Sequence, residues 1–124
     1  MLGDKMDLFN NLEVPGRAGE VFVTSSATVT TYAMSVYETV LRIILVSTNA
    51  MAVTLPSVAE AAGKLYSIGI TTDGGATATV SDKGDDAALT DITLTDDEDG
   101  VVLYSDGRYW WVMATRGLLA TDYD

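Results

Sequence analysis

The chain has 124 residues, with 18 acidic and 7 basic side chains and a formal net charge of -11. This length suits one domain with a single hydrophobic core. The sequence has no cysteine and no histidine, which excludes disulfides, thiolate nucleophiles and histidine-based acid–base catalysis. The acidic balance argues against nucleic acid as a partner, because its phosphates would be repelled. The longest apolar run near the middle, residues 43–46, is far short of the roughly 20 residues of a membrane helix, so we expect no membrane partner.

Residues 1–16 differ in pattern from the rest of the chain. Their apolar residues do not follow a long amphipathic period, and Pro15-Gly16 ends the segment. We therefore predict an N-terminal arm that is extended or briefly helical. Its apolar residues need a surface to cover them, either on the arm's own domain or on a neighbouring subunit. These residues are Leu2, Met6, Leu8, Phe9 and Leu12.

Strands are predicted from residue 19 onward, and the longest covers residues 37–47. Leu41, Ile43 and Leu45 form one of its faces, and Val40, Ile44 and Val46 form the other. Because both faces are apolar, both must be covered. Two arrangements satisfy this requirement: a central strand of a sandwich, or a strand with one face in a subunit interface.

The next elements are a half-buried strand over residues 51–55 and a short helical turn over residues 57–63. Ser57 and Glu60 have the spacing of a capping box, and Gly63 suits the left-handed C-terminal position. Alternation then predicts a strand over residues 66–70, a turn at 73–75, and a strand over 76–80 that is antiparallel to its predecessor.

Most of the charge imbalance lies in residues 82–99, with a short strand over residues 90–95 inside this stretch. An EF-hand alignment of the acids puts Thr95 at the first ligand position and Asp106 at the last, with strands rather than helices as flanks. The match is poor. We therefore predict solvated acidic turns and no metal site.

The last predicted element is a hairpin, formed by residues 101–105 and 108–114 around Asp106-Gly107. This loop predicts the cross-strand pairs Tyr104–Tyr109, Leu103–Trp110 and Val102–Trp111. Both faces of the hairpin then carry large aromatic side chains, which a solitary small domain seldom needs.

Eight to ten strands joined by short turns predict an all-β fold, an antiparallel β-sandwich or barrel-like domain with one short helical turn and an N-terminal arm. The expected organisation is the arm over residues 1–16, a β-rich domain over 17–118 and a C-terminal tail over 119–124.

Few residues of this chain are suited to catalysis. Ser81-Asp82 and Ser105-Asp106 have no histidine with which to form a triad. A hydrolase built on two carboxylates stays open, but its acid needs burial and these acids cluster in polar turns. We expect no enzyme and no cofactor. The aromatic side chains of the last hairpin either fill the core and an interface or form a sugar-stacking platform.

Two segments resemble structural modules of tailed bacteriophages. Residues 53–68, VTLPSVAEAAGKLYSI, look like a stretch in which a strand ends in Leu-Pro, a small Ala/Gly-rich turn follows and the next strand opens with an aromatic residue. Residues 102–113, VLYSDGRYWWVM, are similar to the closing hairpin of the same modules. The resemblance implies a virion β-module of a capsid decoration (cement) protein or of a tail fibre or spike, usually trimeric. It carries over no catalytic residue.

Within this resemblance, the short chain without a fibre shaft and the apolar arm favour a decoration protein. We expect a homotrimer that is made in the host cytoplasm and binds the major capsid protein on the outer surface of the head. The arm residues Leu2, Met6, Leu8, Phe9 and Leu12 would dock on the shell. Val40, Ile44, Val46 and Trp111 would form the subunit interface. The alternative is a tail-fibre or receptor-binding module that recognises host surface glycans.

Overall fold

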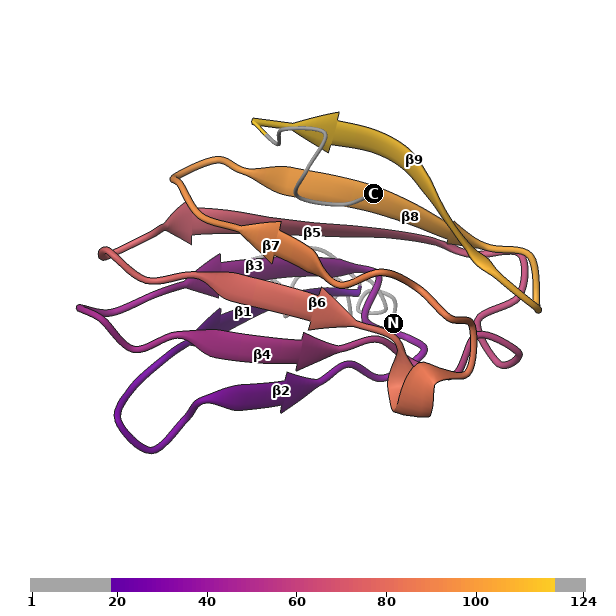
Figure 1. The fold of residues 1–124 in the computed structure, drawn as a ribbon, viewed down its shortest axis with the longest axis horizontal. Helices are drawn as coiled ribbons and strands as arrows, with labels where there is room; N and C mark the ends of the chain where they lie inside the picture. The colour runs from indigo at the N-terminus through magenta and orange to yellow at the C-terminus, as the bar shows by residue number, and fades with distance from the viewer. Residues whose placement is uncertain (1–18, 118–124) are drawn as a thin grey trace, which may run out of the picture.

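The computed structural model describes residues 19–117, so the predicted arm over residues 1–16 and the predicted tail over 119–124 lie outside the described residues. Within this range the chain forms nine strands and one short 3-10 turn (Figure 1). The elements are β1 (Glu20–Thr24), β2 (Thr31–Ala33), β3 (Val40–Ile44), β4 (Met51–Thr54), β5 (Leu65–Thr72), β6 (Ala78–Ser81), η1 (Lys83–Asp85), β7 (Ile92–Leu94), β8 (Gly100–Ser105) and β9 (Trp110–Arg116).

The strands form two sheets, and the chain alternates between them from β1 to β6. The five-stranded sheet has the order β1-β3-β5-β8-β9, and the four-stranded sheet has the order β2-β4-β6-β7. Strands β1, β3 and β5 pair in parallel, as do β2, β4 and β6. Figure 1 shows these two sets of strands pointing in opposite directions. The first six strands therefore wind as a flattened coil, and β7, β8 and β9 complete the two sheets by antiparallel pairing.

The β-rich fold is confirmed, but both sheets are mixed and neither is closed. The predicted antiparallel pairing of residues 76–80 with the preceding strand is wrong, because β6 lies in the other sheet, parallel to β4. The turn at Asp73 explains the difference. The Ala76 amide donates to the Asp73 carbonyl. Gly74 has a φ of 54°, and the Leu45 carbonyl lies too close for a side chain at this position. The chain there crosses between layers instead of folding back within one sheet.

Alternating side chains of both sheets fill one hydrophobic core. On β3, Leu41 and Ile43 point inward and are fully buried, whereas Val40 and Ile44 are half-buried on the outer face. The predicted division of this strand into two faces is therefore confirmed. The four-stranded sheet contributes the inward residues Met51, Val53, Ala78, Val80, Ile92 and Leu94 to the same core.

The short helical turn predicted over residues 57–63 forms no regular helix, but the Ala61 amide donates to the Ser57 carbonyl at 3.0 Å, as in a single helical turn. The Val58 amide donates to the Asp86 carboxylate at 2.9 Å, so a distant side chain provides the N-terminal partner. Gly63 has a φ of 83°, and its amide donates to the Ser105 carbonyl at 2.8 Å. Because the segment is tied at both ends to other parts of the fold, it does not develop a regular helix.

The closing hairpin forms, but its register differs from the predicted one by two residues at Tyr104 and Leu103 and, beyond a bulge, by three at Val102. The observed pairs are Ser105–Trp110, Tyr104–Trp111 and Leu103–Val112, followed by a bulge. The Asp106 carboxylate accepts the amide N–H groups of Arg108 and Tyr109, which holds a longer turn than the predicted two-residue loop. A shift of two residues returns each side chain to the same face of the strand, so the predicted faces survive.

The core predicts a matched pair of stability effects. Val53 is 1% exposed and Val29 is 41% exposed. We expect Val53→Ala to lower the free energy of unfolding by about 2–3 kcal/mol, through lost burial and a residual cavity. Val29→Ala should cost less than about 0.5 kcal/mol, as at most surface positions. Equal costs in chemical denaturation would contradict the placement of the core.

Candidate interaction surface

The outer faces of the two sheets differ sharply in chemistry. Register and alternation place small, uncharged side chains on the outside of the four-stranded sheet: Thr31, Ala33, Ala52, Thr54, Thr79, Ser81 and Thr93. The outside of the five-stranded sheet carries much larger apolar side chains: Phe22, Val40, Ile44, Leu65, Val102, Tyr104 and Trp111. Of these, Phe22, Leu65 and Trp111 are 50%, 54% and 53% exposed. Exposed apolar side chains gathered on one sheet face are typical of an interaction site.

Three residues form a ridge at one end of this outer face. Leu65 on β5 pairs with Tyr104 on β8, and Tyr104 pairs with Trp111 on β9. We call these three residues the ridge. Since neighbouring strands lie about 4.8 Å apart, the three side chains form a continuous row.

The Trp111 ring is held in place although half of it is exposed. Its indole Nε1 donates to Asp106 Oδ2 at 2.9 Å, and Asp106 Oδ1 accepts the Arg108 and Tyr109 amides at 2.8 and 2.7 Å. These hydrogen bonds, led by the one from Trp111, lower the pKa of Asp106. The carboxylate is therefore ionised at neutral pH and fixes the ring orientation.

A groove of about 450 Å³ lies at the other end of the same face. Its floor contains Gly69 on β5 and Gly100 on β8, which are direct partners across the two strands. Because neither position has a side chain, the groove is lined here by backbone. Arg42 and Arg116 lie on either side, and Gly69 is buried beside the Arg42 guanidinium. We call this feature the groove.

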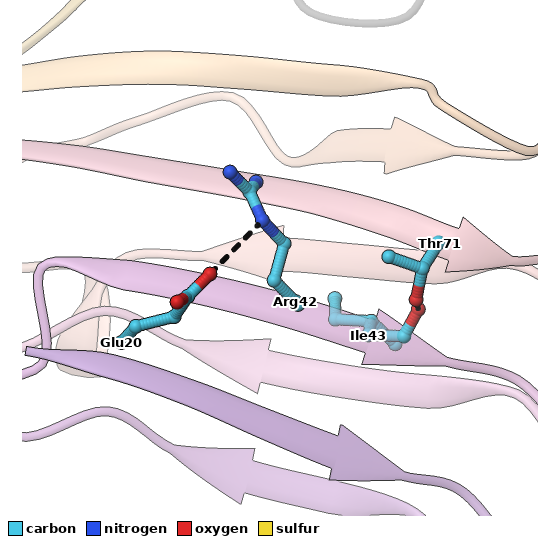
Figure 2. Close-up of polar contacts among 4 residues, drawn as sticks. All are labelled: Glu20, Arg42, Ile43 and Thr71. Atoms are coloured by element: carbon cyan, nitrogen blue, oxygen red, sulfur yellow. Dashed lines mark hydrogen bonds and ion pairs between the residues drawn. The ribbon is translucent and has the colours of Figure 1, made fainter. Parts of the chain in front are cut away.

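The two arginines at the groove are each paired with a glutamate. Arg42 Nε lies 3.7 Å from Glu20 Oε2, and Arg116 pairs with Glu98. Figure 2 shows the Arg42 side chain extending from β3 across β5, and its Nη1 is 3.4 Å from where a Cβ at Gly69 would lie. Next to it, the Thr71 hydroxyl of β5 donates to the Ile43 carbonyl of β3 at 3.1 Å, which adds a side-chain link between the two strands. Each of the two arginines is thus offset by a glutamate, and buried Asp99 also lines the groove.

The predicted interface residues fall on or beside this outer face. Val40, Ile44 and Trp111 belong to it, and Val46 is 43% exposed just after the end of β3. The predicted docking residues Leu2, Met6, Leu8, Phe9 and Leu12 lie outside the described residues.

Sequence reasoning did not identify the groove or the contribution of Phe22 and Leu65. Alternation over residues 65–71 places Leu65 and Gly69 on one face, so part of the signal was present. The pairing of Gly69 with Gly100 depends on a register between strands about 30 residues apart, which the local pattern does not encode.

The acidic stretch is only partly a set of solvated turns. Asp82 and Asp99 are each 4% exposed. Asp82 accepts the amides of Ala87 and Leu89, and Asp99 accepts the amides of Thr95 and Asp96. These two carboxylates therefore organise loops from inside the fold. In residues 19–117 no group of three or more acidic side chains is placed to hold a metal ion.

The aromatic residues of the hairpin divide between core and surface. Trp110 is buried and packs edge-on against Tyr66, with ring centroids 5.6 Å apart. Tyr109 and Trp111 are exposed, and Tyr104 is half-buried. Trp110 therefore stabilises the core, and only its neighbours are available at the surface.

Comparisons with protein-family models, curated proteins and solved structures found no match to this chain. Over the described residues, no helix has the length and apolar character needed to cross a membrane.

The Asp106–Trp111 contact predicts an acid-dependent change at the surface. Because the pKa of Asp106 in the folded chain is lowered from 3.8, its stabilising hydrogen bonds are present above that pH and are lost as the pH falls through the lower folded value. We expect the indole N–H resonance of Trp111 to shift in an NMR titration with a midpoint below pH 3.8. Asp106→Ala should abolish this transition; an unchanged titration in that variant would contradict the assignment.

Proposed function

We propose that this chain is a structural protein of a tailed-bacteriophage virion, which binds the outer capsid surface as a homotrimer and stabilises the head. In this proposal the two open sheets form the β-sandwich of the module. The resemblance of residues 53–68 and 102–113 to such modules supports the proposal. So does the division of the surface into an apolar face suited to contacts between proteins and acidic loops suited to solvent.

The observation that carries the proposal is the exposed apolar outer face of the five-stranded sheet. Phe22, Leu65 and Trp111 are about half exposed there, next to half-buried Val40 and Ile44. Covering such a surface with another protein lowers the free energy of the folded chain in water. A role in assembly uses this face directly, with Val40, Ile44, Val46 and Trp111 as subunit contacts.

The proposed mechanism is mechanical. The apolar residues of the arm bind the major capsid protein across junctions between shell subunits, so that separating those subunits also requires breaking the bound contacts. A protein that binds only the assembled state stabilises it in proportion to RT ln(1 + [L]/Kd), where [L] is its free concentration. The stabilisation therefore grows as heads approach full occupancy.

Removal of the arm tests the capsid-binding part of the proposal. We expect a variant without residues 1–14 to remain folded and trimeric but to lose at least tenfold in affinity for empty heads, because the apolar docking residues are gone. Co-sedimentation with heads measures binding, and sedimentation velocity measures the trimer. A matched full-length variant, Leu8→Ser with Phe9→Ser, should show the same defect.

Full decoration of heads by the truncated chain would overturn the arm assignment. Loss of both the trimer and head binding would show that the arm holds the subunits together instead, and would also overturn it.

A second candidate function is favoured by the two exposed rings at the hairpin tip, Tyr109 and Trp111, beside a pocket of about 380 Å³. Exposed aromatic rings can stack on sugars, as a receptor-binding tail module would require. A glycan array separates the two functions. Decoration predicts no binding, whereas the tail module predicts glycan binding that Trp111→Ala abolishes.

A further inference from the structure

We propose that the ridge of one copy of this chain docks into the groove of a second copy. The ridge is Leu65, Tyr104 and Trp111, and the groove is the floor of Gly69 and Gly100 between Arg42 and Arg116. This inference rests on the proposed homotrimer and names the surfaces through which its subunits meet.

The two features have the same strand spacing because they lie on the same strands. Ridge residue Leu65 and groove residue Gly69 are four positions apart on β5, and Tyr104 and Gly100 are four positions apart on β8. Neighbouring positions of the ridge and neighbouring positions of the groove are therefore separated by the same distance, the strand spacing of about 4.8 Å. A row of side chains at this spacing can therefore lie in register with the strands that form the groove.

The two features also match in chemistry. The groove offers two guanidinium groups, and the ridge offers two aromatic rings with the ionised Asp106 beside Trp111. Guanidinium groups bind the faces of aromatic rings, and Arg adds planar stacking that Lys does not provide. Because Asp106 fixes the Trp111 ring in the free chain, little side-chain freedom is lost on docking.

A second copy is the occupant that the geometry favours. Ridge and groove lie about 13 Å apart on one face, at 3.3 Å for each of four residues, so the two cannot meet within one chain. Each subunit can present its ridge to one neighbour and its groove to another. Such a head-to-tail contact closes into a ring of three when the rotation between neighbouring copies is that of a threefold axis, as a homotrimer requires. The two arginines at the groove also reduce the repulsion between two acidic chains there.

Filling the groove tests the proposal. Gly69 does not have a left-handed φ, and a Cβ at this position would meet Arg42 Nη1 and the Asp99 carbonyl at 3.4 Å, which is ordinary contact. We expect Gly69→Val to fold and to weaken self-association at least tenfold in sedimentation velocity at micromolar concentration. The matched control is Ala52→Val, which adds similar bulk to the outer face of the four-stranded sheet and should leave assembly unchanged.

A mixing experiment tests the complementarity itself. A ridge variant, Leu65→Ser with Trp111→Ser, should also be monomeric when alone. It keeps an intact groove, whereas Gly69→Val keeps an intact ridge. An equimolar mixture should therefore form a heterodimer with one copy of each variant, detected by native mass spectrometry. If Gly69→Val does not fold, as judged by circular dichroism, Gly69→Ala replaces it in both experiments.

The outcomes separate this inference from the proposed function. If the unmodified chain assembles and both variants assemble to the same mass, the ridge–groove contact is overturned, while the homotrimer and the capsid proposal stand on another surface. If both variants are monomeric but no heterodimer forms on mixing, the contact is also overturned. If the unmodified chain is monomeric at micromolar concentration, the homotrimer fails together with this inference, and co-sedimentation with heads still decides capsid binding.

Discussion

The interaction that the surface depends on is the backbone pairing across the five-stranded sheet. Strands β5, β8 and β9 are far apart in sequence or joined by a bulged hairpin, yet their register aligns Leu65, Tyr104 and Trp111 in one row and Gly69 with Gly100 in another. A slip of one residue in any of these pairs would turn the row toward the core. The surface chemistry is therefore a consequence of the ladder, and side chains in the core hold that ladder in place.

The core fixes the register through residues that face inward beside the surface rows. Tyr66, between Leu65 and Ser67, is fully buried, donates its hydroxyl to the Val36 carbonyl at 2.8 Å and contacts Trp110 edge-on. Ser105, next to Tyr104, donates to the Val58 carbonyl at 2.6 Å. Each outward residue of the ridge on β5 and β8 thus has an inward neighbour that is both buried and hydrogen-bonded, which prevents the strand from sliding.

Local alternation predicted much of the fold, and long-range pairing limited the prediction. The two faces of residues 40–46 and the strand at 90–95 were predicted from apolar alternation alone, and both predictions are confirmed. The parallel winding was missed because β1 and β3 begin 20 residues apart, and the turns between them give no sign of which sheet the chain enters next. The hairpin register was missed because a single side chain, Asp106, accepts two amides and lengthens the turn.

The same reasoning applies to the candidate surface. Val40, Ile44 and Trp111 were predicted as interface residues because their strands have two apolar faces. Each strand carries that pattern in its own sequence. The groove arises only when two glycines from distant strands become partners, and nothing in either strand alone requires that.

Electrostatics separates the surface into parts with different roles. Buried Asp82 and Asp99 hold loops through backbone amides, while the other acids of residues 82–99 leave the loops strongly negative. At physiological salt, charges more than about 8 Å apart are largely screened, so this negative charge acts mainly between molecules whose acidic loops come close together. On the apolar face, the two Arg–Glu pairs reduce that repulsion. Contacts through the acidic loops are therefore disfavoured relative to contacts through the sheet face, where apolar surface can be buried.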